Sequence, residues 1–299
     1  MLLKDFLKEA VARLEHLYPA PEARSIVQMV CESRIGTSRY THILEPGRTI
    51  EEESLGILLS DIDRLSAGEP VQYVLGFAEF CGRKFKVTPD VLVPRPETET
   101  LCQDALAFGT ALKESRGASG NPAPVRILDL CTGSGCIAWT MALGIPGAEV
   151  TGTDISLKAL SVASGQDFSS EMEATGAVAP DFVAADLLSD VEAFGHGRFD
   201  LVLSNPPYIM ESEKAAMRVN VLGFEPHLAL FVPDGDPLVF HRAVARWSAS
   251  LLLPGGRGIA EINERLGEET RKVFEEAGFR EVETVKDIFG KNRFISYLK

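Results

Sequence analysis

One strand–turn–helix segment constrains the fold of this chain most strongly. Residues 125–130 form an apolar run typical of a buried strand, and the turn 131–135 that follows contains Gly133 and Gly135. Residues 136–143 then have the character of a helix. A strand, a glycine-rich turn and a helix in this order predict a nucleotide-binding crossover of a parallel sheet. The glycines let backbone approach a ligand, and free N–H groups at the helix start attract an anion.

Two further strand-like segments each end in an acidic residue. Residues 149–154 end in Asp154, 21 residues after Gly133, which is the spacing for a carboxylate that binds ribose hydroxyls. Residues 181–186 end in Asp186, which is placed to meet an adenine edge. Each acid taken alone is equally typical of a helix cap. Because ligands of parallel sheets bind at the carboxyl ends of the strands, the three features together favour one adenosine-type ligand.

The glycine turn favours an adenosine without phosphates. No phosphate-holding Arg or Lys follows the turn, and there is no Walker lysine. S-adenosylmethionine fits because an acidic pocket tolerates its sulfonium cation, and S-adenosylhomocysteine would be its product. Asp129, on the first strand, is expected to face the amino-acid part of this cofactor. The predicted cofactor-binding residues are Asp129, Thr132, Gly133, Ser134, Gly135, Asp154, Ile155, Asp186, Leu187 and Asn205.

The four residues Asn205-Pro206-Pro207-Tyr208 follow the apolar run 199–204 and lie where that strand leaves the sheet. Proline cannot continue a ladder and holds the residue before it extended, so a stiff tip results. Its acceptors are the Asn205 side-chain oxygen and the Pro206 carbonyl, and backbone donors are few. Such a tip suits an NH2 group held by both protons, with Tyr208 as a flat face beside it. A plain proline-rich turn is the alternative interpretation.

These motifs, in this order, resemble the class I S-adenosylmethionine-dependent methyltransferases that act on a planar nitrogen. Three more segments, 70–76, 80–82 and 91–99, resemble the HemK/PrmC family, the peptide chain release factor glutamine methyltransferases. The resemblance covers about residues 45–299. The chain departs from it at Asn263, where the family often has Gly, and at Leu266, where Gln is common. We assign both departures to the sheet edge beyond the site.

The alternation of strands and helices predicts an α/β fold, a parallel sheet with helices on both faces. The resemblance makes this a Rossmann-like, mostly parallel seven-stranded sheet of class I methyltransferase type, with a small N-terminal helical domain joined by a β-hairpin. We expect a helical substrate-recognition domain over 1–75, the linking hairpin over 76–95 and the methyltransferase domain over 96–299. Residues 281–285 and 293–298 are predicted to pair as an antiparallel hairpin, and 115–124 to form a flexible surface loop.

The resemblance implies methyl transfer to the side-chain N5 of a glutamine in release factors, which are then the protein partner. Asn205, Pro206 and Tyr208 are the candidate catalytic residues. The candidate substrate-binding residues are these three with Pro207 and Arg95. Two rivals share the catalytic tip: a ribosomal-protein glutamine methyltransferase, and a nucleic-acid methyltransferase acting on adenine N6 or guanine N2. A non-catalytic cofactor-binding protein and a dehydrogenase are less consistent with the motifs.

Charge and cysteine content narrow the classes further. The net charge is −13, and the helical portion and the remainder are both acidic, so direct nucleic-acid binding is not expected. Five cysteines without C-x-x-C spacing indicate a reducing cytoplasm and no structural zinc, and no metal site is predicted. The apolar runs are too short to cross a bilayer, so no membrane association is expected. We expect a cytoplasmic monomer.

Overall fold

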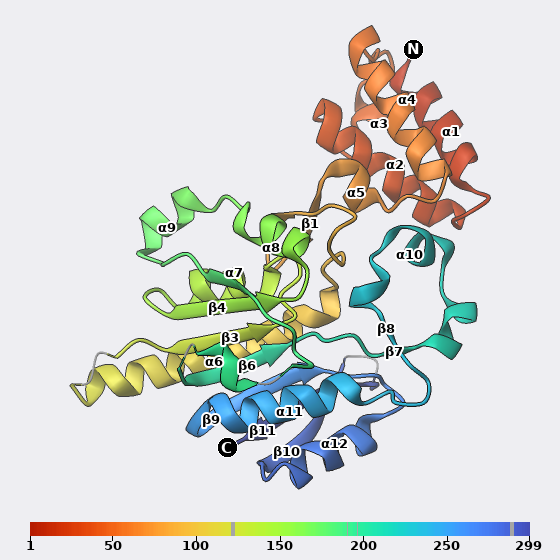
Figure 1. Cartoon of the computed structure of the whole chain (residues 1–299). Coiled ribbons are helices and arrows are strands. Elements are labelled where there is room, and N and C mark those ends of the chain that lie inside the picture. The colour runs from red at the N-terminus through yellow and green to blue at the C-terminus, as the bar shows by residue number, and fades with distance from the viewer. Residues whose placement is uncertain (121–122, 190, 196, 288–289) are drawn as a thin grey trace. The chain divides into compact units, whose positions relative to one another are not determined.

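The computed structural model describes residues 1–120, 123–189, 191–195, 197–287 and 290–299 (Figure 1). The chain separates into two compact units. The first comprises Met1–Phe77 together with Met217–Glu225, and the second comprises Ala78–Ala216 together with Pro226–Lys299. No helix of the described ranges is long and apolar enough to cross a membrane.

The first unit is helical. Its elements are α1 (Leu3–Leu14), α2 (Ala20–Ile35), α3 (Thr41–Leu44), α4 (Glu52–Ser66), α5 (Val71–Leu75) and α10 (Val219–Phe224). Apolar residues at helical spacing, among them Phe6, Val27 and Ile62, form one buried core. The segment with α10 joins this unit through an ion pair between Arg218 Nη1 and Glu22 Oε1 at 2.6 Å. No sequence pattern predicted that residues 217–225 would belong to the helical first unit.

The second unit is built on a seven-stranded sheet in the order β10-β11-β9-β6-β3-β4-β5 (Figure 1). β11 is antiparallel to both of its neighbours, β10 and β9, and the other pairs among these described strands are parallel. This is the predicted mostly parallel seven-stranded sheet. The strands are β3 (Arg126–Leu130), β4 (Glu149–Asp154), β5 (Asp181–Ala184), β6 (Phe199–Ser204), β9 (Leu252–Glu261), β10 (Arg280–Lys286) and β11 (Asn292–Leu298).

Both faces of this sheet are covered by helices. Successive residues of a strand point to opposite faces, so Ile127 contributes to one hydrophobic core and Leu128 to the other. The first core includes side chains of α6 (Pro96–Ala118) and α7 (Cys136–Gly144), and the second includes those of α11 (Val239–Leu251) and α12 (Gly267–Glu276). The remaining helices of this unit are α8 (Leu157–Ser164), α9 (Ser169–Thr175), η1 (Val191–Phe194), η2 (Glu211–Ala216) and η3 (His227–Ala229).

Two small sheets and a hairpin complete the fold. The two-stranded sheet of β1 (Phe77–Phe80) and β2 (Arg83–Lys86) lies where a hairpin was predicted. A second pairs β7 (Ile209–Met210) with β8 (Phe231–Val232). The predicted antiparallel hairpin at the end of the main sheet is confirmed as β10 and β11, although residues 288–289 of its connection lie outside the described residues.

The predicted loop over 115–124 is wrong at its beginning, because α6 continues through Ala118. Arg116 explains the extension. Its guanidinium pairs with Asp200 of β6, with Nη2 2.6 Å from Oδ1, and it also donates to the Pro124 carbonyl at 2.8 Å. This half-buried bidentate pair holds the last helical turn against the sheet, where composition alone indicated a flexible segment. Asn121 and Pro122 of the predicted loop lie outside the described residues.

Candidate active site

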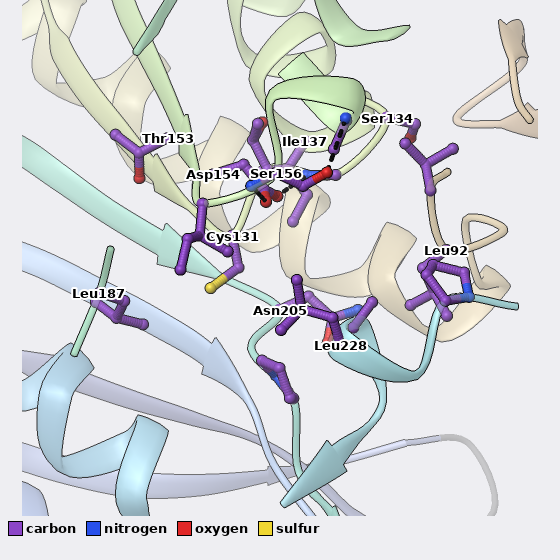
Figure 2. Close-up of a pocket in the computed structure, with 18 of the residues that line it drawn as sticks. Leu92, Cys131, Ser134, Ile137, Thr153, Asp154, Ser156, Leu187, Asn205 and Leu228 are labelled. Atoms are coloured by element: carbon purple, nitrogen blue, oxygen red, sulfur yellow. Dashed lines mark hydrogen bonds between the residues drawn. The ribbon is translucent and has the colours of Figure 1, made fainter. Parts of the chain in front are cut away.

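A cavity of about 230 Å³ lies in the second unit, beyond the carboxyl ends of β3, β4 and β6 (Figure 2). This is where parallel sheets bind ligands. Its wall brings together most of the residues that the sequence singled out, from five separate segments. Those that line it are Arg95, Thr132, Gly133, Ser134, Asp154, Ile155, Asp186, Leu187, Asn205 and Pro207. Asp129, Gly135, Pro206 and Tyr208 are not among its lining residues.

Asp129 supports the glycine turn from behind the cavity wall. Its side chain is fully buried, and Oδ2 accepts hydrogen bonds from the Thr132 hydroxyl at 2.6 Å and from the Ala138 N–H at 3.2 Å. Oδ1 has no hydrogen-bond partner among the described residues. Burial raises the pKa of Asp129 to about 7, against the lowering effect of these two bonds. Asp129 therefore fixes the start of α7 and retains one buried acceptor.

The two glycines of the turn have different tasks. Both have positive φ, +54° at Gly133 and +79° at Gly135. A Cβ at Gly135 would lie 3.0 to 3.2 Å from Ala163, Trp139 and Phe182, whereas one at Gly133 would meet nothing within 4 Å. Gly135 is thus required for close packing of the turn, and Gly133 leaves space on the cavity side.

Asp154 joins the turn to the next helix. Its Oδ2 accepts from the Gly133 N–H and its Oδ1 from the Ser156 N–H, both at 2.9 Å. Burial raises the pKa of this carboxyl, although the same backbone bonds oppose the rise. Each oxygen retains a lone pair for a further donor in the cavity that it lines. Asp186, by contrast, is exposed, and its Oδ1 accepts from the Leu188 N–H at 2.9 Å.

The Asn205 tip is held by side chains that are remote in sequence. Asn205 Nδ2 donates to Thr98 Oγ1 at 3.3 Å, and the Thr98 hydroxyl donates to Glu261 Oε2 at 2.8 Å. The Tyr208 hydroxyl donates to the other oxygen, Glu261 Oε1, at 2.7 Å. Thr98 and Glu261 are 2% and 1% exposed, so this chain of bonds is shielded from water. Sequence reasoning missed Glu261 as a site residue and named Thr98 only within a family segment.

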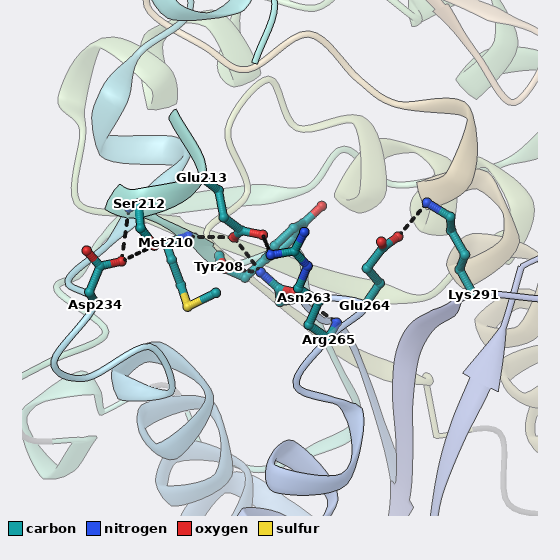
Figure 3. Close-up of polar contacts among 9 residues, drawn as sticks. All are labelled: Tyr208, Met210, Ser212, Glu213, Asp234, Asn263, Glu264, Arg265 and Lys291. Carbon is teal, nitrogen blue, oxygen red and sulfur yellow. Dashed lines mark hydrogen bonds and ion pairs between the residues drawn. The ribbon is translucent and has the colours of Figure 1, made fainter. Parts of the chain in front are cut away.

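A second cluster fixes the backbone just beyond the tip (Figure 3). Asn263 Nδ2 donates to the Tyr208 carbonyl at 3.1 Å and to Glu213 Oε2 at 2.8 Å. Glu213 Oε2 also accepts from the Met210 N–H at 2.9 Å. Our assignment of the Asn263 departure to a sheet edge beyond the site is therefore wrong, because Asn263 bonds directly to the backbone of the Asn205–Tyr208 motif. The signal was present in the sequence as a departure from the family pattern.

Tyr208, which we expected to offer a flat face to the substrate amide, is anchored through its hydroxyl. Its hydroxyl is engaged by Glu261, and burial raises the pKa of Tyr208 well above its usual value. Pro206 is buried, and neither residue lines the cavity described above. Their direct contact with a substrate remains a prediction. Among the described residues, no three His, Cys, Asp or Glu side chains are grouped to hold a metal ion.

The strand order, with one antiparallel strand next to the end of the sheet and a cavity at the strand ends, defines a class I methyltransferase. Family comparison agrees with this class. The chain matches the methyltransferase small domain over residues 108–223 and the PrmC N-terminal domain over residues 5–76.

Full-length relatives narrow the class to one family. The chain is 38% identical over 283 residues to the release factor glutamine methyltransferase of Bacteroides thetaiotaomicron, covering 95% of each chain. It is 37% identical over 298 residues to that of Cereibacter sphaeroides, covering 99% of this chain and 98% of the relative. That of Flavobacterium psychrophilum is 32% identical over 295 residues, with the same coverage. The chain belongs to the release factor glutamine methyltransferase family, as its motifs predicted.

Proposed function

We propose that this protein transfers a methyl group from S-adenosylmethionine to the side-chain N5 of a glutamine in peptide chain release factors. The observation that carries this proposal is the position of Asn205. Its side chain lies on the wall of the same cavity as Asp154 and the glycine turn, on a tip stiffened by two prolines. Membership of the release factor glutamine methyltransferase family supports the same reaction and the same protein substrate.

The residues of the cavity fit the cofactor. The Asp154 carboxylate has a lone pair on each oxygen for ribose hydroxyls, and Ile155, 52% exposed, offers an apolar surface beside it for the adenine. Asp129 does not line the cavity, and its buried carboxyl supports the glycine turn from behind the wall through Thr132 and Ala138. When bound, S-adenosylmethionine supplies an electrophilic methyl group on a sulfonium.

The Asn205 tip would hold the substrate amide. A carboxamide nitrogen is a poor nucleophile because its lone pair is delocalised onto the carbonyl, so its orientation matters. Asn205 Oδ1 and the Pro206 carbonyl would accept its two protons, aim the nitrogen at the methyl group and stabilise the positive charge that develops on it. Orientation of this kind is worth on the order of 7–11 kcal/mol. Transfer breaks a carbon–sulfur bond and forms a carbon–nitrogen bond, and a proton from the nitrogen passes to water.

The test is direct. The full chain is incubated with methyl-labelled S-adenosylmethionine and a purified release factor, and the product is mapped by mass spectrometry. We expect one methyl group on a glutamine side chain. Asn205→Ala should bind the cofactor within about twofold of wild type and lose transfer by at least about 100-fold, because the acceptor oxygen is gone.

Two controls make the result decisive. A release factor whose mapped glutamine is replaced by glutamate should accept no methyl group. Ribosomal RNA, DNA and ribosomal proteins are offered to the same enzyme preparation. Methylation of one of these in preference to the release factor, or transfer by Asn205→Ala at the wild-type rate, would overturn the proposal.

A further inference from the structure

Asn205 can present either end of its side-chain amide to the cavity, and the two ends have opposite chemistry. Oδ1 accepts hydrogen bonds and Nδ2 donates them, while their shapes are nearly the same. An NH2 group on a substrate is held only by the oxygen. Packing alone does not distinguish the two orientations, so the hydrogen bonds behind Asn205 must decide between them.

The groups behind Asn205 impose one orientation. A carboxylate accepts hydrogen bonds and cannot donate, so the single hydroxyl proton of Thr98 is committed to Glu261 Oε2 at 2.8 Å. The Thr98 oxygen is then an acceptor towards Asn205. The Asn205 side chain must therefore turn Nδ2 towards Thr98, at 3.3 Å, which leaves Oδ1 for the cavity that Asn205 lines. Figure 2 shows Asn205 at this wall.

Glu261 is fixed so that it remains an acceptor. Its second oxygen accepts from the Tyr208 hydroxyl at 2.7 Å, and its backbone lies in β9, paired with Phe294 of β11 and accepting from His241 Nε2 at 3.0 Å. The pKa of Glu261 is raised, chiefly by burial and also by the charge of Glu97, while the bonds from Tyr208 and Thr98 and the charge of Arg293 oppose the rise. In this geometry each carboxyl oxygen accepts from one hydroxyl, Oε2 from Thr98 and Oε1 from Tyr208, so both oxygens act as acceptors.

We propose that Thr98 and Glu261 are positioning residues that orient the Asn205 amide, so that its oxygen faces the substrate nitrogen. This inference rests on the proposed function, because it concerns the same transfer. Glu261 is not among the residues that line the cavity, and Thr98, which lines it, is only 2% exposed; in this proposal both act through Asn205. We call the hydrogen bonds that join Glu261, Thr98 and Asn205 the relay. If the relay is broken, the Asn205 amide rotates freely. When its Nδ2 then faces the cavity, Nδ2 and the substrate NH2 are both donors, and no hydrogen bond forms between them.

The decisive variants change one hydroxyl. Thr98→Val keeps the shape of the side chain and removes the relay, whereas Thr98→Ser keeps the hydroxyl and loses a methyl group. Thr270→Val is the matched control, because Thr270 is also fully buried but lies in α12, and within the described part of the chain its hydroxyl donates only to the Leu266 carbonyl, at 2.7 Å. All three are made in the full chain and assayed with S-adenosylmethionine and a release factor.

We expect kcat of Thr98→Val to fall about 10- to 100-fold, with the cofactor Kd and the KM for the release factor within about twofold of wild type. Thr98→Ser should recover kcat to within about threefold, and Thr270→Val should match wild type. A general loosening of the fold would instead affect cofactor binding as well and would not be rescued by serine. Unchanged kcat in Thr98→Val, or equal losses in the valine and serine variants, would overturn the inference.

A second readout does not depend on the substrate. The side-chain amide signals of Asn205 in nitrogen-15 NMR spectra can be identified by their loss in Asn205→Asp. The Asn205 side-chain amide signals should have the same chemical shifts in Thr98→Ser as in wild type, and the amide protons should exchange slowly with water in both. In Thr98→Val the signals should shift and the protons should exchange faster. If wild type fails to methylate release factors, the proposed function fails, while these signals still decide whether Thr98 orients Asn205. Unchanged signals in Thr98→Val would refute that role.

Discussion

The two walls of the cavity are built in different ways. The cofactor wall is held by bonds between residues close in the chain, from Asp154 to Ser156, two apart, and from Gly133 to Asp154, 21 apart. The wall with Asn205 is held by bonds between residues far apart in the chain. Asn205 and Thr98 are 107 residues apart, and Thr98 and Glu261 are 163 residues apart. The cofactor wall is formed by a local strand–turn–helix segment, whereas the wall with Asn205 forms only when distant segments meet in the tertiary fold.

By our proposal, the two walls also differ in function: the cofactor wall binds the adenosine ligand, and the Asn205 wall selects the substrate. A glycine turn with a following acid serves any ligand that contains an adenosine. By our proposal, the Asn205 wall decides which nitrogen is methylated, because it would hold the acceptors for the substrate amide. Changes in the first wall should therefore alter cofactor affinity, and changes in the second should alter kcat.

The largest effect is expected at Asp154. Asp154→Ala removes the carboxylate that holds both the glycine turn and, by our proposal, the ribose, so about 3–4 kcal/mol of binding should be lost. Calorimetry should show S-adenosylmethionine binding weakened several hundred-fold, with kcat at saturation within a few-fold of wild type. The exposed Asp186→Ala is the control and should cost about tenfold. A comparable loss of kcat would remove the distinction between the walls.

Glu261→Gln should come next, and its effect should be on kcat. A glutamine has one acceptor oxygen, which cannot satisfy the hydroxyls of both Thr98 and Tyr208, so the relay loses its direction. We expect kcat to fall about 30- to 100-fold, equivalent to about 2–3 kcal/mol, with cofactor affinity retained. Steady-state kinetics measures both.

Tyr208→Phe is the companion to this variant, because it removes the other hydroxyl and leaves Thr98 in place. Its expected loss of kcat is only about threefold. If Tyr208→Phe proved worse than Glu261→Gln, the tyrosine and not the relay would be the functional partner of Glu261.

A smaller effect is expected from Asn263→Gly, which introduces the residue that the family often has. It removes the bonds to the Tyr208 carbonyl and to Glu213, so the tip loses one of its supports. We expect kcat to fall about threefold to fivefold and the melting temperature to fall by about 2–4 °C, for a loss of about 1 kcal/mol. Calorimetric melting and kinetics test this. An unchanged kcat would place Asn263 outside the functional wall.

The smallest effect on catalysis is expected from Asp129→Asn, which should alter the free energy of unfolding and its pH dependence instead. Burial raises the pKa of Asp129 to about 7 in the folded chain, so between pH 4 and 7 the folded state binds a proton that the unfolded state has lost. Wild-type stability should therefore fall as pH rises through this window, by up to about 4 kcal/mol, and the asparagine variant should lack this fall.

The asparagine also buries an unsatisfied NH2 group, at a cost of about 1–3 kcal/mol. Asp129→Asn should thus be less stable than wild type at pH 4.5 and up to about 1–3 kcal/mol more stable at pH 8, as measured by urea unfolding. A difference between the two proteins that does not vary with pH would mean that Asp129 is ionised throughout.

The comparison also explains how much the sequence could predict. The sheet, its antiparallel hairpin and the cofactor-wall residues follow from local patterns: apolar strands, glycines with positive φ at 133 and 135, and an acid at the end of β4. The position of Asn205 at the cavity also follows, because it comes directly after a buried strand.

What remained hidden depends on contacts between distant segments. Thr98 precedes Glu261 by 163 residues, and no local pattern indicates that the two meet. The extension of α6 depends on a pair between Arg116 and Asp200, and the place of α10 depends on one between Arg218 and Glu22. Asn263 was visible as a departure, but only the fold shows that it bonds to the Tyr208 carbonyl.

The most direct test is a crystal structure of the protein with S-adenosylhomocysteine and a release-factor segment that contains the target glutamine. We expect the glutamine amide nitrogen within about 3 Å of both Asn205 Oδ1 and the Pro206 carbonyl, with Asn205 Nδ2 on Thr98. A glutamine amide bound away from the Asn205 tip, or an Asn205 that turns its nitrogen to the substrate, would contradict the proposed function and the role of the relay.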